Sequence, residues 1–273
     1  MQIGNKIFDV KNHTYIMGIL NVTPDSFSDG GKFNTLDRAL YHAQKMINEG
    51  VDIIDVGGES TRPGHTLLSD EEEIQRISTV IRKLKENFDV PISLDTYKSK
   101  VAQAGIEAGA DLINDIWGLK YDEKLAKVIA ENNVYCCLMH NRDNTDYYDD
   151  FLADVINDMR KTVDIAHKAG IKDEKIILDT GIGFGKTYEH NLIMLNNLNC
   201  FEVLGYPLLL GASRKSVIGN TLNLPVNERL EGTIVTSVLA VMNNYAFVRV
   251  HDVKENLRAI KMALAVRNSG GKN

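Results

Sequence analysis

The chain has 273 residues, of which 44% are hydrophobic and 25% charged, a balance typical of a globular protein with a full core rather than of a disordered chain. Its 31 basic and 37 acidic residues give a net charge of −6, which excludes a general electrostatic attraction to nucleic acid or to an anionic membrane. Any anion that it binds must therefore be held by a local group of basic residues.

Short apolar runs alternate with longer segments of helical periodicity along the chain. The apolar runs, which predict strands, cover residues 15–20, 52–56, 91–94, 111–113, 134–139, 175–178, 207–210 and 246–250. The predicted helices cover residues 36–49, 70–86, 99–108, 122–131, 149–169, 188–198, 227–242 and 252–266. Gly50, Gly109 and Gly170 follow three of these segments, as helix stops do.

The strand runs show little polar alternation, as expected for strands that are buried on both faces. Eight consecutive strand and helix units in an α/β protein predict a closed (β/α)8 TIM barrel rather than an open sheet. We expect one domain that spans residues 1–273, in which residues 1–13 close the N-terminal end of the barrel.

Polar residues and glycines directly follow nearly every predicted strand. In a TIM barrel these positions meet at one mouth, where the chemistry takes place. A single Asp, Asn or Ser there is explained equally well as a helix cap, and we assign Asp115 to capping or to the support of its neighbours. Capping does not require Arg62, Lys215, Arg249 and His251 at one end, so the joint pattern predicts a binding site.

Two glycine motifs after the sixth predicted strand argue against a nucleotide-binding site. The segment Gly185-Lys186-Thr187 resembles the end of a P-loop, but Thr180 stands where that motif requires Gly. Gly181-Ile182-Gly183 lacks the third glycine of a dinucleotide fingerprint, because residue 186 is Lys.

The cysteines and the N-terminal residues give information about the cellular localisation of the protein. The three cysteines show neither metal-ligand spacing nor a disulfide framework, as expected in a reducing cytoplasm. Lys6, Asp9 and Lys11 lie where a signal peptide would need an apolar stretch. No apolar run approaches the roughly 18 residues of a membrane span. We therefore expect a cytoplasmic protein that has no membrane or nucleic-acid partner.

The loops after the strands resemble those of the dihydropteroate synthases, which belong to the pterin-binding enzyme superfamily. Residues 21–31 (Asn-Val-Thr-Pro-Asp-Ser-Phe-Ser-Asp-Gly-Gly) and 57–64 (Gly-Gly-Glu-Ser-Thr-Arg-Pro-Gly) are similar to the two long signature loops of that family. Residues 179–186 match a third motif except that Thr180 replaces the usual Pro. Ser213-Arg214-Lys215 and Arg249-Val250-His251 complete the set. The resemblance runs from about residue 14 to residue 266 and is weakest at residues 141–144.

The resemblance implies a pterin site deep in the barrel. Asp95, Asn114 and Asp179 match the pterin-binding positions, where fixed acceptors suit the ring and exocyclic nitrogens of a dihydropterin. Lys215 matches the lysine that contacts the pterin carbonyl and ring nitrogen and lies near the p-aminobenzoate site. Met139 and Phe184 would pack on the pterin ring.

The resemblance also implies how a diphosphate leaving group and a second substrate are bound. Thr61, Arg62, Arg249 and His251 would bind the diphosphate, and Asn21 would ligate Mg2+ together with it. Phe27, Pro63 and Ser216 would border the p-aminobenzoate pocket. Asp29, Lys215, Arg249 and His251 are the expected catalytic residues. The implied reaction joins (7,8-dihydropterin-6-yl)methyl diphosphate to p-aminobenzoate, in a homodimer that uses the outer faces of the C-terminal helices.

Two other functions are compatible with a pterin-binding barrel. A pterin-dependent methyltransferase, which moves a methyl group from a folate to a corrinoid protein, would keep Asp95, Asn114 and Asp179. It would lack the long first loop and the Ser-Arg-Lys motif, and both are present here. A degenerate barrel that serves only as a binding or regulatory module would have lost residues such as Asn21 or Arg249, and these are intact.

Overall fold

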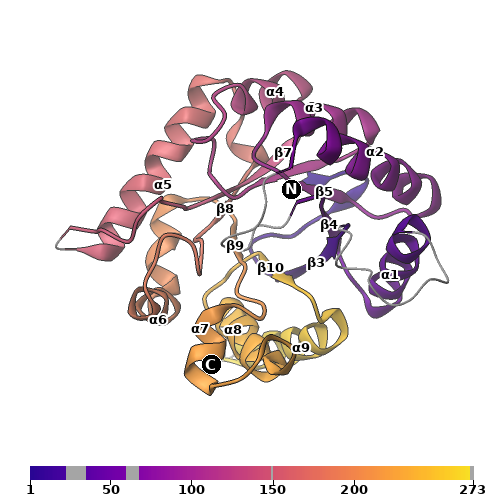
Figure 1. Cartoon of the computed structure of the whole chain (residues 1–273). Helices are drawn as coiled ribbons and strands as arrows, with labels where there is room; N and C mark the ends of the chain where they lie inside the picture. Colours follow the sequence, from indigo (N-terminus) through magenta and orange to yellow (C-terminus); the bar gives the residue numbers. More distant parts are fainter. Residues whose placement is uncertain (23–34, 60–67, 149, 271–273) are drawn as a thin grey trace.

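The computed structural model describes residues 1–22, 35–59, 68–148 and 150–270 (Figure 1). Eight parallel strands close into a barrel in the order β10-β3-β4-β5-β6-β7-β8-β9, which confirms the predicted TIM barrel. These strands are β3 (Tyr15–Asn21), β4 (Ile53–Gly57), β5 (Ile92–Asp95), β6 (Leu112–Asp115), β7 (Tyr135–Met139), β8 (Ile176–Asp179), β9 (Leu208–Leu210) and β10 (Phe247–Val250). Within the described ranges, no helix has both the length and the apolar character that crossing a bilayer requires.

Helices surround the strands on the outside of the barrel (Figure 1). They are α1 (Thr35–Glu49), α2 (Asp70–Asn87), α3 (Ser99–Ala108), α4 (Leu125–Asn132), α5 (Phe151–Lys168), α6 (Tyr188–Asn196), α7 (Ser216–Leu222), α8 (Leu230–Met242) and α9 (Val253–Ser269). Short 3-10 helices lie at η2 (Asp173–Lys175), η3 (Leu198–Leu204) and η4 (Val226–Glu228). Gly50, Gly109 and Gly170 have φ of 94°, 113° and 91°, the left-handed backbone expected of helix stops.

The structure differs from the predicted helices most clearly at four places. Helix α8 begins at Leu230 instead of residue 227, and α9 ends at Ser269 instead of residue 266. Helix α4 begins at Leu125 instead of residue 122, because the carboxylate of Asp122 accepts hydrogen bonds from the backbone N–H groups of Ser99 and Lys124 and so holds a turn. Helix α7 was not predicted, because its seven residues are too few to show a periodic apolar face.

Side chains alternate along each strand between the barrel interior and the surrounding helices. On β4, Ile54 and Val56 belong to the core between strands and helices, whereas Ile53 belongs to a separate cluster inside the barrel. The hairpin of β1 (Gln2–Ile3) and β2 (Lys6–Ile7) precedes the barrel, and Ile3 and Phe8 pack into that interior cluster. Burying a side chain such as Phe8, which is 1% exposed, stabilises the fold by about 1.5–3 kcal/mol.

Candidate active site

Above the apolar layer, the inward positions of the strands carry charged and polar side chains. Arg249 on β10 donates from Nε to Asp55 Oδ2 on β4 and from Nη2 to Asp95 Oδ2 on β5, both at 2.6 Å. Asn114 on β6 donates from Nδ2 to the same oxygen of Asp55 at 3.1 Å. Both carboxylates and Asn114 are buried. The closed barrel thus brings together residues that are up to 194 positions apart in the sequence.

This cluster holds two buried carboxylates against one guanidinium, so it carries an excess of negative charge. Burial raises the pKa of Asp95 to about 7; Arg249 opposes the rise and the charge of Asp55 adds to it. Asp55 Oδ1 and Asp95 Oδ1 are buried and have no hydrogen-bond partner among the described residues. Because buried acceptors are seldom left unpaired, these oxygens suit a ligand that presents N–H donors.

Asp55 is the residue of this site that the sequence analysis missed. It lies within the run of residues 52–56 that we treated as an apolar strand. The available signal was a carboxylate in the middle of a strand buried on both faces, two residues before Gly57 and therefore on the same interior face. A buried, unpaired carboxylate is costly, so such a residue indicates a buried cation nearby.

The opposite wall of the mouth is built by Asp179, Phe184 and Lys215. Lys215 Nζ lies 4.4 Å from the centroid of the Phe184 ring and donates to the backbone oxygen of Ile182. Burial lowers the pKa of Lys215 to about 8, with Asp179 opposing the change and Arg249 adding to it. Burial also raises the pKa of Asp179, and Lys215 opposes that rise most. The attraction between Asp179 and Lys215 therefore offsets part of the cost of burying each charge.

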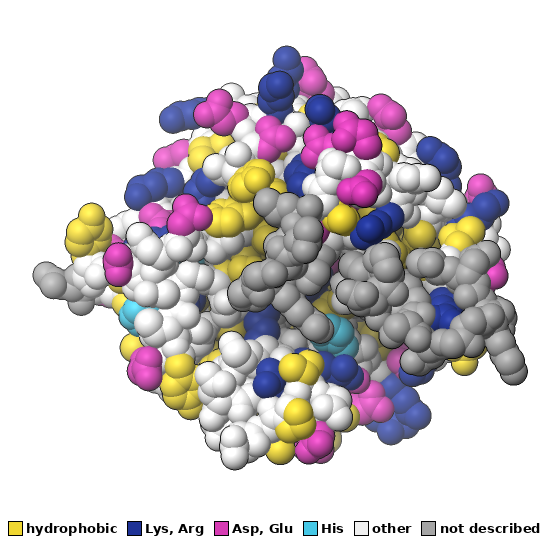
Figure 2. All heavy atoms as spheres, viewed as in Figure 1, with side chains coloured by type: hydrophobic (Ala, Val, Ile, Leu, Met, Phe, Trp, Pro, Cys, Tyr) yellow, Lys and Arg dark blue, Asp and Glu magenta, His cyan; other side chains and the backbone are white. Residues whose placement is uncertain are grey.

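Ser213 orients His251, the last residue of the basic group. Its hydroxyl oxygen accepts the backbone N–H of His251 at 3.2 Å and lies 3.0 Å from Nδ1 of the same residue. Ser213 is buried, so its own proton finds an acceptor if Nδ1 is unprotonated. This arrangement favours the tautomer of His251 that carries its proton on Nε2. Basic side chains and a histidine gather near the middle of the face shown in Figure 2.

Arg214 fixes the turn that presents Lys215. Its φ of 57° lies in the left-handed region, which is uncommon for a residue other than Gly. Two hydrogen bonds to Asp252, at 3.0 and 2.6 Å, and a bond from its backbone N–H to Thr233 Oγ1 at 3.1 Å hold this conformation. The loops after β9 and β10 are thus locked to each other.

The remaining predicted site residues fall into two groups. Asn21 ends β3, Met139 ends β7 opposite Asp179 in the strand register, and Ser216 begins α7. These three lie at the same end of the barrel as the residues above. The other five predicted residues lie outside the described ranges: Phe27, Asp29, Thr61, Arg62 and Pro63.

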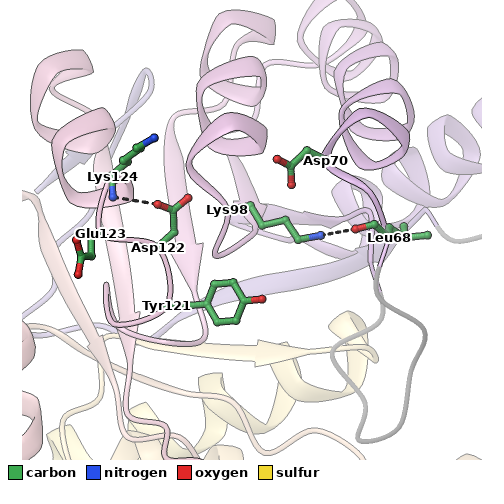
Figure 3. Close-up of a pocket in the computed structure, with 7 residues that line it drawn as sticks. All are labelled: Leu68, Asp70, Lys98, Tyr121, Asp122, Glu123 and Lys124. Atoms are coloured by element: carbon green, nitrogen blue, oxygen red, sulfur yellow. Dashed lines mark hydrogen bonds between the residues drawn. The ribbon is translucent and has the colours of Figure 1, made fainter.

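A separate pocket of about 520 Å³ lies beside the mouth (Figure 3). Within the described ranges it is lined by Leu68, Asp70, Lys98, Tyr121, Asp122, Glu123 and Lys124, none of which is a predicted site residue. Lys98 Nζ donates to the backbone oxygen of Leu68 at 3.0 Å and is paired with Glu59 at 2.7 Å and Glu73 at 2.8 Å. These ion pairs give Lys98 a structural role beside the mouth.

The loop after β8 packs so closely on β7 that only Gly fits at position 181. Its φ is +72°, and a Cβ atom there would lie 2.0 Å from the backbone oxygen of His140. Gly181→Ala is therefore expected to lower the free energy of unfolding by about 2–5 kcal/mol, the sum of left-handed strain and overpacking.

Gly205→Ala is the matched control for chemical denaturation of this variant. Gly205 has a similar φ of +76° but nothing within 4 Å of a Cβ atom, so only the strain of about 1–2 kcal/mol should remain. Equal losses in the two variants would contradict the close packing of the loop.

Comparison with known proteins gives the family of the chain. Residues 17–251 match the model of the pterin binding enzymes. The dihydropteroate synthase of Clostridium beijerinckii is 62% identical over 263 residues, which are 96% of this chain and 97% of that protein. The structure of the Clostridium difficile dihydropteroate synthase in the presence of pteroic acid has a TM-score of 0.93 and 51% identity, covering 95% of this chain and 99% of that one.

A more distant structure has a similar fold. The Xanthomonas albilineans dihydropteroate synthase with 4-aminobenzoic acid has a TM-score of 0.90 and 37% identity, covering 94% of both chains. The matches extend over nearly the whole chain, including the barrel mouth described above. The chain therefore belongs to the pterin-binding enzymes and, among them, to the dihydropteroate synthase family.

Proposed function

We propose that this protein joins (7,8-dihydropterin-6-yl)methyl diphosphate to p-aminobenzoate and releases 7,8-dihydropteroate and diphosphate. The amine nitrogen forms a bond to the pterin methylene, the C–O bond to the diphosphate breaks with its electron pair, and the amine loses a proton. The observation that carries the proposal is the pair of buried carboxylate oxygens beside Arg249 that receive no hydrogen bond from the described part of the chain. The pteroic acid and 4-aminobenzoic acid named with two relatives are the product skeleton and one substrate.

The pterin would bind between the two walls of the mouth. Asp95 and Asp179 would accept hydrogen bonds from the ring and exocyclic N–H groups, and the Asn114 amide can both donate and accept. Lys215 would donate to the pterin carbonyl and ring nitrogen. Met139 is 3% exposed and lies on the inward face opposite Asp179, where it and Phe184 would contact the ring.

The diphosphate would bind at the basic side of the same mouth. Arg249 and the Nε2–H group of His251 would donate to its oxygens, and we place Thr61 and Arg62 there as well. These donors would stabilise the negative charge that the leaving group acquires as the C–O bond breaks. Asp29 would face the cation that develops on the methylene, whereas Phe27, Pro63 and Ser216 would border p-aminobenzoate.

We propose Mg2+ as the metal of this site. Asn21 offers one neutral amide oxygen, a hard ligand, and the described residues hold no group of three His, Cys, Asp or Glu side chains arranged around a metal. A single neutral ligand binds a divalent cation weakly, so the ion would bind together with the diphosphate. When bound, Mg2+ would neutralise part of the charge on the leaving group.

Diphosphate release tests the proposed reaction. Purified protein is given 6-hydroxymethyl-7,8-dihydropterin diphosphate and Mg2+, with and without p-aminobenzoate, and dihydropteroate is measured alongside diphosphate. We expect release that depends on the arylamine. Pterin binding without arylamine-dependent turnover would overturn the proposal and favour the methyltransferase or the binding module.

We also propose a cytoplasmic homodimer of single-domain subunits. The outer faces of α7, α8 and α9 expose apolar side chains, which favour a second copy as the partner. They include Leu222, Val235, Met242, Met262 and Val266, which are 45–66% exposed. The three free cysteines fit a reducing compartment. Light scattering on the purified chain should give twice the mass of 30.5 kDa, and a monomer would contradict this assembly.

A further inference from the structure

Lys186, at the end of the loop after β8, has a buried amine with three partners. Nζ lies 2.9 Å from the backbone oxygen of Gly181, 2.9 Å from that of Phe184 and 2.8 Å from Nδ1 of His140. The two carbonyls belong to the loop itself, and His140 directly follows β7. One side chain therefore ties the loop to itself and to the neighbouring strand.

Asp158 on α5 places a negative charge close to the other side of the His140 ring. Its Oδ2 lies 3.5 Å from Nε2 of His140. Burial raises the pKa of Asp158, but the nearby His140 and hydrogen bonds from Arg142 and Lys161 outweigh this effect and keep the pKa below its usual value. His140 Nε2 is buried and makes no hydrogen bond to any described residue, but the nearby negative charge of Asp158 favours a proton on this nitrogen and leaves Nδ1 as an acceptor. Burial lowers the pKa of His140 to about 3, which keeps the imidazole neutral.

The acceptors around Lys186 therefore favour an ammonium group. Two carbonyls and an unprotonated Nδ1 can only accept hydrogen bonds, and an ammonium supplies three donors. Burial lowers the pKa of Lys186, with Lys215 adding to the shift and Asp179 opposing it. A neutral amine would have only two donors and would leave its lone pair directed at an acceptor. The neutral ring of His140 thus lies between the ammonium of Lys186 and the carboxylate of Asp158.

We propose that Lys186 is a positioning residue, which through its ammonium and His140 fixes the loop that presents Asp179 and Phe184 to the pterin. The proposal rests on the proposed function, because it takes these two residues as pterin contacts. Ile182 lies between the two residues whose carbonyls bind Lys186, and its own backbone oxygen accepts a hydrogen bond from Lys215. The backbone N–H of Gly181 donates to Asp179 Oδ1 at 2.8 Å. Lys186 thus binds the same loop that contacts Asp179 and Lys215, two residues of the site.

Lys186→Met tests this role, because it keeps most of the side-chain volume and removes the donors. Isothermal titration would use 6-hydroxymethyl-7,8-dihydropterin, which lacks the diphosphate, and separately inorganic diphosphate with Mg2+. We expect the Kd for the pterin to rise by about tenfold to 100-fold, as when other supporting hydrogen bonds behind a ligand are lost. The Kd for diphosphate should change by less than about threefold, because Arg249 and His251 lie outside this loop.

Ser237→Ala is the matched control, since it breaks the buried 2.8 Å hydrogen bond to Asn256 between α8 and α9. It should lower stability without changing either Kd. An unchanged pterin Kd in Lys186→Met would overturn the positioning role and leave the proposed function intact. Conversely, wild-type protein that binds the pterin without turnover would overturn the proposed function alone.

Nitrogen NMR of the His140 ring gives a second measurement, made on the wild-type protein and therefore independent of whether the variant folds. We expect an unprotonated Nδ1 and a protonated Nε2. A proton on Nδ1 would mean that Lys186 is a neutral amine and would overturn the proposal.

Discussion

Arg249→Met is expected to lower the free energy of unfolding by about 3–5 kcal/mol, because it leaves two buried carboxylates without their cation. Asp55 is fully buried and Asp95 is 7% exposed, and both oxygens that receive the guanidinium lie 2.6 Å from it. The same change should lower kcat/KM for the pterin diphosphate by about 10²-fold to 10³-fold, the usual effect of removing a donor to the charge that develops in a transition state. Chemical denaturation and initial rates measure the two effects.

Two further variants separate the charge from the loss of side-chain volume. Arg258→Met makes the same change on an exposed position of α9 and should alter stability by less than about 0.5 kcal/mol. Adding Asp55→Asn to Arg249→Met removes one of the two stranded charges and should recover part of the stability but none of the activity. If the double variant were no more stable than Arg249→Met, the stability loss would not arise from unpaired carboxylates.

The sequence predicted the barrel well because its strands are buried on both faces. Such strands appear as continuous apolar runs, and all eight were found within two residues of their observed bounds. The short helix α7 was not predicted, because its position also depends on tertiary contacts. The guanidinium of Arg229 packs against Gly219 so closely that a Cβ atom on residue 219 would lie 2.1 Å from it. Local sequence carries no trace of such a contact.

The site was predictable where loops follow strands and unpredictable inside the strands and behind the loops. The position of Asp95, Asn114 and Asp179 at one mouth was predictable because strand ends meet there, whereas their expected contact with a pterin came from the family resemblance. Asp55 was missed because its partner Arg249 lies 194 residues away, so its buried charge has no local explanation. Lys186 was considered only as a member of sequence motifs and was given no role of its own, since the carbonyls that it binds become neighbours only in the folded loop.

The activity is expected to have a narrow pH optimum set by Asp95 and Lys215. Asp95, with a pKa of about 7, gains a proton below that pH and loses an acceptor for the pterin. Lys215, with a pKa of about 8, loses its proton above that pH and with it the charged donor. In a profile of kcat/KM, which reports the free enzyme, we expect a maximum between about pH 7 and 8 and a fall of about tenfold per unit on either side.

Substitutions should move the two limbs of this profile separately. Asp55→Asn removes the negative charge that raises the pKa of Asp95, so the acid limb should shift to lower pH while the alkaline limb stays in place. In Lys215→Arg the guanidinium stays protonated at alkaline pH. The alkaline limb should therefore disappear from the profile, even if the variant has a lower kcat/KM. Limbs that stayed at the same pH in both variants would assign the profile to other groups.

The same pKa shifts require that the two groups contribute least to stability where activity is highest. The folded pKa of Asp95 lies above its usual 3.8, so the folded state holds more protons and stability falls as pH rises from about 4 to about 7. The folded pKa of Lys215 lies below its usual 10.5, so stability falls as pH decreases from about 10.5 to about 8. The sum of the two penalties is largest between pH 7 and 8, where each group is at least half charged. Denaturation of the wild type and of Asp95→Asn across pH 4–7 should therefore show a steeper decline in the wild type than in the variant, in which other carboxyls of raised pKa such as Asp179 remain. Parallel curves would rule out a raised pKa for Asp95.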